Sequence, residues 1–276
     1  QAVNYSGLVA WYKLEKGNGT FWNDSSGNGN FLLNASGNSL YTAEGKVGGA
    51  YTFDGIDDYL VTPSTSSIAT SGKTACVWFY IRTLPTNDVM KSIIFKPGAF
   101  DIRVRTFGSS TNINTRVSNS TSPYGVSSAY DSVSTVSVNK WIHICSVWKG
   151  QLPGENLTLQ YYFNGTLDSN RTTDMYDANG LVGSTQSLPL YIAQDNTIDR
   201  YANATIDEVM IFNKSLSAQE ILNLYNRTKN IYTDHSLGAS IVNSSELPTN
   251  STVSYSFDWR LFNRSIALVN MPFDLN

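Results

Sequence analysis

Residues 204–225, ATIDEVMIFNKSLSAQEILNLY, join a strand pattern to a helix pattern within one short stretch. The first ten residues are rich in β-branched and apolar side chains, which favours a buried strand. Ser217 and Glu220 then have the three-residue spacing of a capping box. Leu216 and Ile221 stand where a hydrophobic staple would put them. The apolar stripe that follows predicts a short helix that covers one end of a β-sandwich.

Most of the remaining sequence consists of short strand candidates between turns rich in Gly, Asn, Asp and Ser. β-branched and aromatic residues dominate these segments, and several alternate apolar with polar side chains. Short strands at this spacing predict an all-β protein in which two antiparallel sheets pack as a sandwich. The strand candidates are residues 8–14, 49–55, 74–81, 92–96, 101–107, 141–148, 157–165, 188–194 and 204–213.

The composition excludes several classes of protein. Of the 276 residues, 41% are hydrophobic and 15% are charged, and the formal net charge is −3. Lysines and arginines are scattered, so the sequence has no basic stripe for nucleic acid or for anionic lipid. No apolar run approaches the roughly 20 residues of a membrane-spanning helix. A chain that begins at Gln1 is expected for a processed secretory product.

Asparagine gives the strongest compositional signal. Asn-x-Ser/Thr triplets occur fourteen times, where chance predicts about six. Asn-rich turns can produce such triplets by accident. Otherwise they mark an extracellular or cell-surface protein, whose N-glycans supply the solvation that its few charges do not. The predicted N-glycosylation sites are Asn4, Asn18, Asn23, Asn34, Asn119, Asn156, Asn164, Asn170, Asn203, Asn213, Asn226, Asn243, Asn250 and Asn263.

Four segments of the sequence carry a family resemblance: GLVAWYKLEKGNGTFWNDSSGNGN (7–30), GKVGGAYTFDGIDDYLVTP (45–63), KWIHICSVWKG (140–150) and ATIDEVMIFNKSLSAQEILNLY (204–225). They resemble the successive signatures of laminin-G-like, concanavalin A-like jelly rolls. They occur in the order found in that family and cover about residues 6–228. The resemblance implies two packed antiparallel sheets of six or seven strands each, and by itself it implies no function.

Pentraxins are relatives of this family, and the likeness to them has two implications. ACVWFY (75–80) and HICSVW (143–148) resemble their pair of cysteine strands. The likeness implies a disulfide between Cys76 and Cys145, with two buried free thiols as the alternative. AQDNTID (193–199) stands where pentraxins carry a calcium-binding loop, so Gln194 and Asp195 are candidate calcium ligands.

The stretch FDGIDDYL, residues 53–60, places Asp54, Asp57 and Asp58 around a glycine. In the family this segment links two strands, where aspartate side chains accept hydrogen bonds from nearby amides. The same three carboxylates could instead supply oxygen ligands to a calcium ion. We interpret the stretch as a turn and keep Asp54, Asp57 and Asp58 as candidate metal ligands.

The sequence lacks the catalytic patterns of the family. Its glycosidases carry two carboxylates on one strand, in an E-x-D-x-E type of pattern, on either side of the scissile bond. None of the six glutamates here belongs to such a pattern. Asp207 and Glu208 are adjacent, so on a regular strand their side chains would point to opposite faces. We therefore predict a protein without enzymatic activity.

The family resemblance ends before the last fifty residues. TVSYSFDWRL (252–261) alternates like a half-buried strand, and IALVNMPF (266–273) follows as a continuous apolar run. ASIVNSS (239–245) is a third strand candidate. The tail resembles part of an immunoglobulin-like domain, a fold that needs about seven strands. We predict two regions, a jelly roll over 1–228 and a connector with a β-strand tail over 229–276.

Three strands cannot cover the apolar surface of the tail, because even a lone hairpin is marginal in water. The tail could dock on its own jelly roll, begin a longer multidomain protein, or complete a sheet in a neighbouring subunit. Head-to-tail donation does not close on itself and would yield a filament. The residues assigned to such self-association are Val253, Tyr255, Phe257, Trp259, Leu261, Ile266, Leu268 and Val269.

Together these patterns predict a non-enzymatic, N-glycosylated extracellular protein with a structural or adhesive role, assembling into a homopolymeric filament through its C-terminal strands. The alternative is a calcium-dependent, lectin-like module that binds a glycan. A third hypothesis is an inactive domain of a surface enzyme. Aromatic residues are numerous enough for a sugar-binding face, but no single one stands out in the sequence.

Overall fold

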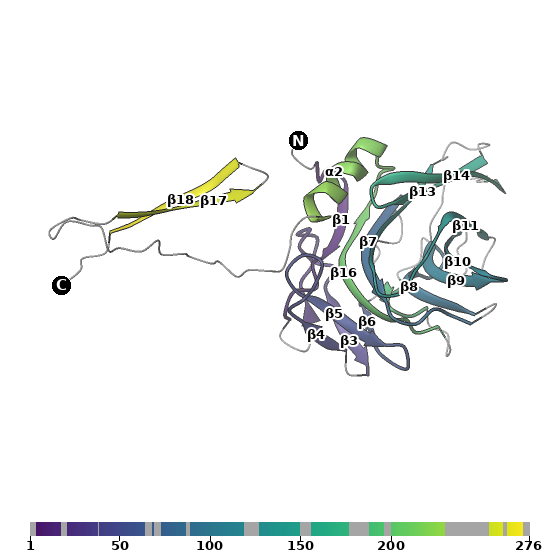
Figure 1. The fold of residues 1–276 in the computed structure, drawn as a ribbon. Helices are drawn as coiled ribbons and strands as arrows, with labels where there is room; N and C mark the ends of the chain where they lie inside the picture. Colours follow the sequence, from purple (N-terminus) through teal and green to yellow (C-terminus); the bar gives the residue numbers. More distant parts are fainter. Residues whose placement is uncertain are drawn as a thin grey trace. The chain divides into compact units, whose positions relative to one another are not determined.

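The chain forms two compact units, residues 1–234 and 235–276. The structure is a computed structural model (Figure 1). The boundary expected at residue 228 lies close to the end of the first unit. The residues that the structure describes are 4–17, 21–37, 39–63, 68, 73–86, 89–118, 127–149, 156–176, 188–195, 200–229, 254–261 and 264–272.

The first unit is a sandwich of two antiparallel sheets, which confirms the predicted all-β jelly-roll class. Sheet A has eight strands, in the order β14–β13–β12–β7–β16–β5–β4, with β1 paired to β16. Its strands are β1 (Leu8–Tyr12), β4 (Leu40–Thr42), β5 (Ala50–Asp54), β7 (Thr74–Ile81), β12 (Trp141–Lys149), β13 (Asn156–Phe163), β14 (Thr166–Tyr176) and β16 (Asn203–Phe212).

Sheet B also has eight strands, in the order β11–β10–β9–β8–β15–β6–β3–β2. Each sheet is therefore somewhat wider than the six or seven strands that the family resemblance implies. The strands of sheet B are β2 (Phe21–Trp22), β3 (Leu32–Ser36), β6 (Tyr59–Val61), β8 (Met90–Lys96), β9 (Phe100–Phe107), β10 (Ser110–Ser118), β11 (Ser127–Thr135) and β15 (Tyr191–Ile192).

The main core lies between the two sheets. Successive side chains of a strand point to opposite faces, so alternate residues of a central strand enter this core. On β12, Ile142, Ile144 and Trp148 belong to it. Cys145 and Val147 belong instead to a second cluster on the outer face of sheet A. Strands buried on both faces explain the nearly continuous apolar runs of the sequence.

Helix α2 (Ala218–Lys229) lies against sheet A (Figure 1). Its buried residues Ile221 and Leu224 belong to this second cluster. The predicted capping box is present, because the Ser217 amide donates to the Glu220 carboxylate over 2.8 Å. The Glu220 amide donates in return to the Ser217 hydroxyl over 3.3 Å. Leu216 is buried in the same cluster as Ile221. The helix thus covers part of the outer face of sheet A rather than an end of the sandwich.

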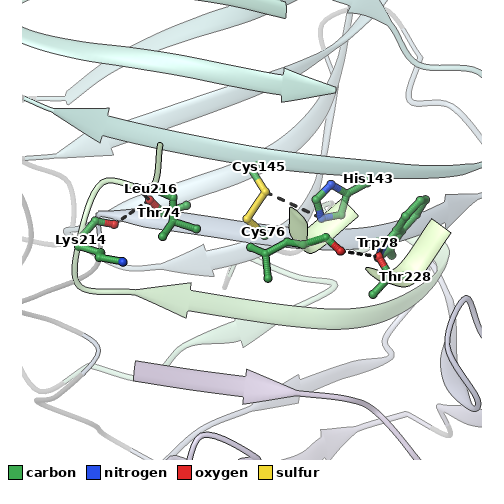
Figure 2. Close-up of a disulfide and its surroundings, with 9 residues drawn as sticks. Thr74, Cys76, Trp78, His143, Cys145, Lys214, Leu216 and Thr228 are labelled. Atoms are coloured by element: carbon green, nitrogen blue, oxygen red, sulfur yellow. Dashed lines mark hydrogen bonds between the residues drawn. A yellow bond between two sulfur atoms is a disulfide. The ribbon is translucent and has the colours of Figure 1, made fainter. Parts of the chain in front are cut away.

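The disulfide implied by the family resemblance is present beneath α2 (Figure 2). Cys76 on β7 and Cys145 on β12 lie directly opposite each other in the strand register and are bonded. His143 packs against the Trp78 ring, with ring centroids 5.0 Å apart. Trp78 also donates its indole N–H to the Thr228 hydroxyl over 2.8 Å. The bridge and α2 therefore belong to one buried layer.

The structure corrects the expectation that Asp207 and Glu208 point to opposite faces of a strand. The register of β16 against β7 shifts between Asp207 and Met210, and Glu208 has a positive φ of 51°. This geometry is a β-bulge, in which an extra residue re-aims the side chains. Asp207 accepts the Val47 amide over 2.8 Å, and Glu208 accepts the Trp11 indole over 3.0 Å. Both carboxylates are buried on the α2 side of sheet A.

The described part of the second unit is an antiparallel hairpin of β17 (Ser254–Leu261) and β18 (Arg264–Pro272). These strands match the predicted strand segments 252–261 and 266–273. The third candidate, 239–245, lies outside the described residues, as does Val253. None of the helices in the described residues is long and apolar enough to span a membrane.

Candidate functional site

The outer face of sheet B carries a row of aromatic side chains. In the strand register Tyr191 lies between Val61 and Phe95. The Tyr191 ring centroid is 6.0 Å from that of Tyr59 and 6.0 Å from that of Phe95. Tyr201 adds a third tyrosine, 6.2 Å from Tyr59. The three tyrosines are half-buried, so each keeps part of its surface open to solvent.

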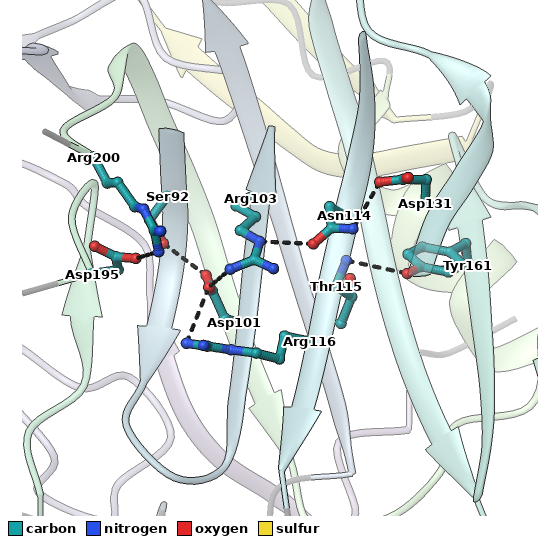
Figure 3. Close-up of polar contacts among 10 residues, drawn as sticks. All are labelled: Ser92, Asp101, Arg103, Asn114, Thr115, Arg116, Asp131, Tyr161, Asp195 and Arg200. Atoms are coloured by element: carbon teal, nitrogen blue, oxygen red, sulfur yellow. Dashed lines mark hydrogen bonds and ion pairs between the residues drawn. The ribbon is translucent and has the colours of Figure 1, made fainter. Parts of the chain in front are cut away.

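A buried ionic cluster continues this row across β9 and β10 (Figure 3). Phe100, Ile102 and Val104 enter the core, so Asp101 and Arg103 between them point outward. Asp101 is completely buried and accepts from Arg103 over 3.0 Å. Its other oxygen accepts the Ser92 hydroxyl over 2.8 Å. Burial raises the pKa of the Asp101 carboxyl above its usual range, and the neighbouring guanidinium groups oppose that shift.

Arg116 connects the ionic cluster to the aromatic row. Its guanidinium lies 3.6 Å from the Asp101 carboxylate and 5.7 Å from the centre of the Phe95 ring. The Arg116 side chain is 22% exposed, whereas that of Asp101 is 0% exposed. The carboxylate therefore holds the Arg116 guanidinium, and the Arg116 side chain stays partly exposed to solvent beside the Phe95 ring.

Asp195 and Arg200 form a second ion pair on this face, with 2.7 Å between Oδ2 and Nη1. The Asp195 side chain is 1% exposed, and that of Arg200 is 32% exposed. Within the described residues, Oδ1 of Asp195 and Oε1 of Gln194 are buried without a hydrogen-bond partner. Such oxygens are costly to bury unless a ligand, a water molecule or a cation satisfies them.

The three aspartates of FDGIDDYL form a turn, as the sequence indicated. The Asp54 amide donates to Asp58 over 2.9 Å, and the Ile56 amide donates to Asp54 over 2.7 Å. Gly55 has a φ of 82°, which a glycine adopts without strain. One carboxylate oxygen from each of Asp54, Asp57 and Asp58 lies within 4.8 Å of the others, and only Asp58 is buried.

The two sets of candidate metal ligands lie near the same end of the paired strands β6 and β15. Asp58 directly precedes β6, and Gln194 follows shortly after β15, which runs antiparallel to it. The group of carboxylates within 4.8 Å contains Asp54, Asp57 and Asp58 but not Asp195. Oxygen donors of this type fit a hard cation such as calcium. Among the described residues, Asp54, Asp57 and Asp58 thus form one set of donors, and Gln194 and Asp195 form a second set.

Comparisons with known proteins agree with this fold. The family model described as the concanavalin A-like lectin/glucanases superfamily matches residues 53–222. The chain belongs to this superfamily. A comparison with curated proteins found no significant match. The superfamily contains both binding proteins and enzymes by its name, so membership alone leaves the activity open.

Solved structures with the same fold include domain 4 of AbnA, an extracellular arabinanase from Geobacillus stearothermophilus, in complex with arabinotriose. It is 18% identical, with a TM-score of 0.59, and the match covers 79% of this chain and 98% of that domain. The binding domain of Paraclostridial Mosquitocidal Protein 1 is 16% identical, with a TM-score of 0.61 and 80% of this chain covered. The binding domain of botulinum neurotoxin DC in complex with SialylT has the same identity and TM-score, with 82% covered.

This concanavalin A-like chain spans about half the length of the toxin binding domains, since the match covers 52% of each. At such low identity these likenesses show a shared fold and nothing finer.

The predicted glycosylation sites of this concanavalin A-like chain can be placed where the structure describes them. None of those with a described side chain is buried. The exposed ones are Asn4, Asn23, Asn34, Asn164, Asn170 and Asn213, and the half-buried ones are Asn203 and Asn226. Asn156 is the first residue of β13. The sites outside the described residues are Asn18, Asn119, Asn243, Asn250 and Asn263.

Sequence reasoning missed the aromatic and ionic residues of sheet B. One signal was present, because DIRVR (101–105) alternates charged residues with apolar ones and so places the charges on a single face. A charged face on a central strand needs counter-ions from neighbouring strands. Tyr59, Tyr191 and Tyr201 had no such signal, because only the tertiary fold brings their rings together.

Proposed function

We propose that the protein is a non-enzymatic extracellular module that binds glycans on the outer face of sheet B. The supporting observation is the row of half-buried Tyr59, Tyr191 and Tyr201 beside the partly exposed Arg116 and Arg200. A sugar ring has an apolar face of C–H groups, which packs on an aromatic ring. Its hydroxyls need planar, fixed donors and acceptors, which a guanidinium held by a carboxylate supplies.

The solved structures support this class of function. The arabinanase domain was solved with arabinotriose, and one neurotoxin binding domain was solved with SialylT. A related neurotoxin binding domain was solved with rat synaptotagmin II, so a protein receptor is also compatible with this fold. Asp101 itself is unsuited to acid–base catalysis on this face, because both of its oxygens are already held by Ser92 and Arg103. A general acid or base needs an oxygen that can reach substrate.

Calcium is part of the proposal. The unpartnered oxygens of Gln194 and Asp195 are suited to hold a calcium ion at the edge of the tyrosine row, and Asp54, Asp57 and Asp58 are a second donor set. A bound calcium ion would neutralise buried carboxylate charge and offer open positions to sugar hydroxyls. Isothermal titration of the chelator-treated protein with calcium tests this point. An Asp195→Asn variant that binds calcium as tightly as the unmodified protein would exclude the Gln194–Asp195 set.

The experiment for glycan binding is an immobilised oligosaccharide array probed with the full chain, with and without a chelator. We expect Tyr191→Ala to weaken binding at least about tenfold, because an aromatic anchor in the centre of a site commonly carries that share of the affinity. Leu167→Ala on β14 is the matched control, since Leu167 is 48% exposed and lies on the other sheet. Binding that survives Tyr191→Ala and Arg116→Ala together would contradict the proposal.

Secretion and N-glycosylation belong to the same proposal. The surface positions of Asn23, Asn34, Asn164, Asn170 and Asn213 are where glycans would have to lie. The protein expressed in a eukaryotic secretory system should lose mass in discrete steps on treatment with an endoglycosidase. An unchanged mass would show that these triplets are accidents of Asn-rich turns.

Assembly through the C-terminal strands is a second candidate function. Strands β17 and β18 form a two-stranded sheet that pairs with no other strand among the described residues. A two-stranded hairpin needs further strands for stability, and strand addition from a neighbouring subunit could supply them. Removal of the last 25 residues should abolish any oligomer seen by light scattering. The same oligomer after truncation would exclude a homopolymer built through these strands.

A further inference from the structure

A groove opens on the outer face of sheet A, opposite to the sheet that carries the proposed glycan face. It lies just beyond the C-terminal end of α2, where Thr228 contacts Trp78 and where Tyr80 stands two residues further along β7. The aromatic and charged residues among those that line it, together with two of the polar ones, are Glu44, Tyr80, Arg82, Asn139, Trp141 and Thr205.

The floor of the groove is set by strand register. Trp141 on β12 lies opposite Tyr80 on β7, and Tyr80 in turn lies opposite Thr205 on β16. Side chains opposite one another in a sheet lie on the same face. The Trp141 and Tyr80 ring centroids are 5.8 Å apart, with an interplanar angle of 60°. Both side chains are half-buried, so they form an angled aromatic floor that remains open to solvent.

Arg82 is held in place above this floor. It donates to the Thr205 hydroxyl over 2.6 Å, and its guanidinium lies 5.4 Å from the centre of the Tyr80 ring. Thr205 is fixed in turn by the Thr52 hydroxyl at 2.9 Å. A guanidinium has five N–H donors, and within the described residues this hydrogen bond uses one of them. Arg82 lines the groove, and the Thr205 hydrogen bond restrains its guanidinium there.

The other polar residues supply acceptors. Glu44 is exposed. Its backbone N–H donates to the Thr42 hydroxyl, which fixes the chain at this point. Asn139 is exposed with a positive φ of 59°, and its backbone N–H donates to the Ile81 carbonyl over 2.9 Å. The groove thus combines three planar polar groups, the carboxylate of Glu44, the side-chain amide of Asn139 and the guanidinium of Arg82. Its formal charge is balanced between Arg82 and Glu44.

This combination matches the surface of a neutral sugar. A pyranose or furanose ring offers an apolar face to an aromatic floor, and vicinal hydroxyls that donate and accept at the same time. An apolar peptide side chain would leave Arg82 and Glu44 desolvated without partners, which costs free energy. An anionic ligand would gain from Arg82 but would be repelled by Glu44.

We infer that the Tyr80–Trp141 groove is a second carbohydrate site, selective for neutral oligosaccharides. It goes beyond the proposed function, because it uses other residues on the other sheet and does not require the sheet B face. Two sites on opposite sheets of one sandwich would make the protein bivalent for glycans, so that one protein molecule could bridge two glycan chains.

The test uses a panel of immobilised neutral arabino-, xylo-, manno- and galacto-oligosaccharides, followed by titration of the strongest binder in solution. We expect Trp141→Ala and Arg82→Ala each to weaken binding by at least about tenfold. Arg82 is exposed, so its substitution keeps the fold even if Trp141→Ala does not. Phe107→Ala is the control, since Phe107 is an aromatic residue that is 62% exposed and lies outside the groove.

The outcomes separate this inference from the proposed function. Loss of neutral-sugar binding in Trp141→Ala and Arg82→Ala, with binding retained in Tyr191→Ala, supports the groove as a site of its own. Absence of binding to every neutral oligosaccharide overturns the inference, as does binding that is insensitive to both groove variants. Binding that is lost only in Tyr191→Ala would contradict a carbohydrate site in the groove and would support the proposed site on sheet B.

Discussion

Trp11 donates its indole N–H to the carboxylate of Glu208 over 3.0 Å, between residues 197 positions apart in the sequence. The two strands that carry them, β1 and β16, are direct neighbours in sheet A. Arg227 of α2 lies 5.8 Å from the centre of the Trp11 ring. The Trp11–Glu208 hydrogen bond therefore joins β1 to β16, and the contact between Arg227 and Trp11 connects α2 to both strands.

Glu208 makes the stability of the protein depend on pH. Burial raises the pKa of Glu208 from 4.5 to about 7, and the Trp11 hydrogen bond opposes that shift. The folded state therefore binds the proton more tightly than the unfolded state does. This contribution to stability is complete below about pH 4.5 and is lost as the pH rises towards 7. We predict that Glu208→Gln raises the free energy of unfolding at pH 8 by up to about 3 kcal/mol.

Urea unfolding at pH 5 and pH 8 measures this effect. The amide oxygen of the introduced glutamine would still accept the Trp11 indole N–H, so the substitution removes the charge and keeps the hydrogen bond. Glu44→Gln is the control, because Glu44 is exposed. An equal effect of Glu208→Gln at both pH values would contradict the assignment.

The disulfide should contribute strongly to stability. Cys76 and Cys145 are separated by 69 residues, and closing such a loop stabilises a protein by about 4 kcal/mol in the chain-entropy model. We expect a Cys76→Ala, Cys145→Ala double variant to lose about this much in urea unfolding. A loss below about 1 kcal/mol would mean that the packing under α2 holds the strands together without the bridge.

Gly165 should not tolerate a side chain. It follows Asn164 in the β13–β14 hairpin, and the φ values of Gly165 and Asn164 are 79° and 48°, the geometry of a tight turn whose second position favours glycine. A Cβ at Gly165 would lie 2.8 Å from the Tyr225 ring of α2. Gly165→Ala combines this clash with backbone strain and should cost about 2–4 kcal/mol.

Gly108 is the matched control for Gly165. It has a positive φ of 59°, but a Cβ there would meet nothing within 4 Å. Gly108→Ala should therefore cost only the backbone strain, about 1 kcal/mol. Equal losses for the two variants in chemical unfolding would show that the contact with Tyr225 contributes nothing.

Asp101 should be essential for the sheet B face. Asp101→Asn would leave Arg103, whose side chain is 6% exposed, without its buried counter-ion. Breaking a buried ion pair in this way commonly costs about 3 kcal/mol or more. We expect a lower unfolding midpoint and weaker glycan binding, since Arg116 loses its anchor. Asp131→Asn should change stability by less than about 1 kcal/mol, because the Asp131 side chain is 39% exposed.

Local patterns in the sequence were sufficient for the fold class. Alternation and β-branched residues predicted the strands, and the Ser217–Glu220 spacing predicted the start of α2, because these signals act over a few neighbouring residues. The bulge at Glu208 was missed, since DEVM reads as an uninterrupted strand until its register against β7 is known. The turn at Asp54 could be recognised from the sequence, but the sequence did not indicate whether Asp54 lies close to Asp195.

Local sequence patterns predicted an all-β sandwich with a capped helix and showed an unusually large set of asparagine triplets, and the family resemblance implied a bridged cysteine pair. Which side chains share a face of the sandwich depended on the fold of the whole chain. Tyr59, Tyr191 and Arg116 come from strands scattered across the chain, and so do Tyr80, Trp141 and Thr205. Strand order and register bring them together, and both depend on long-range pairing that no local pattern encodes.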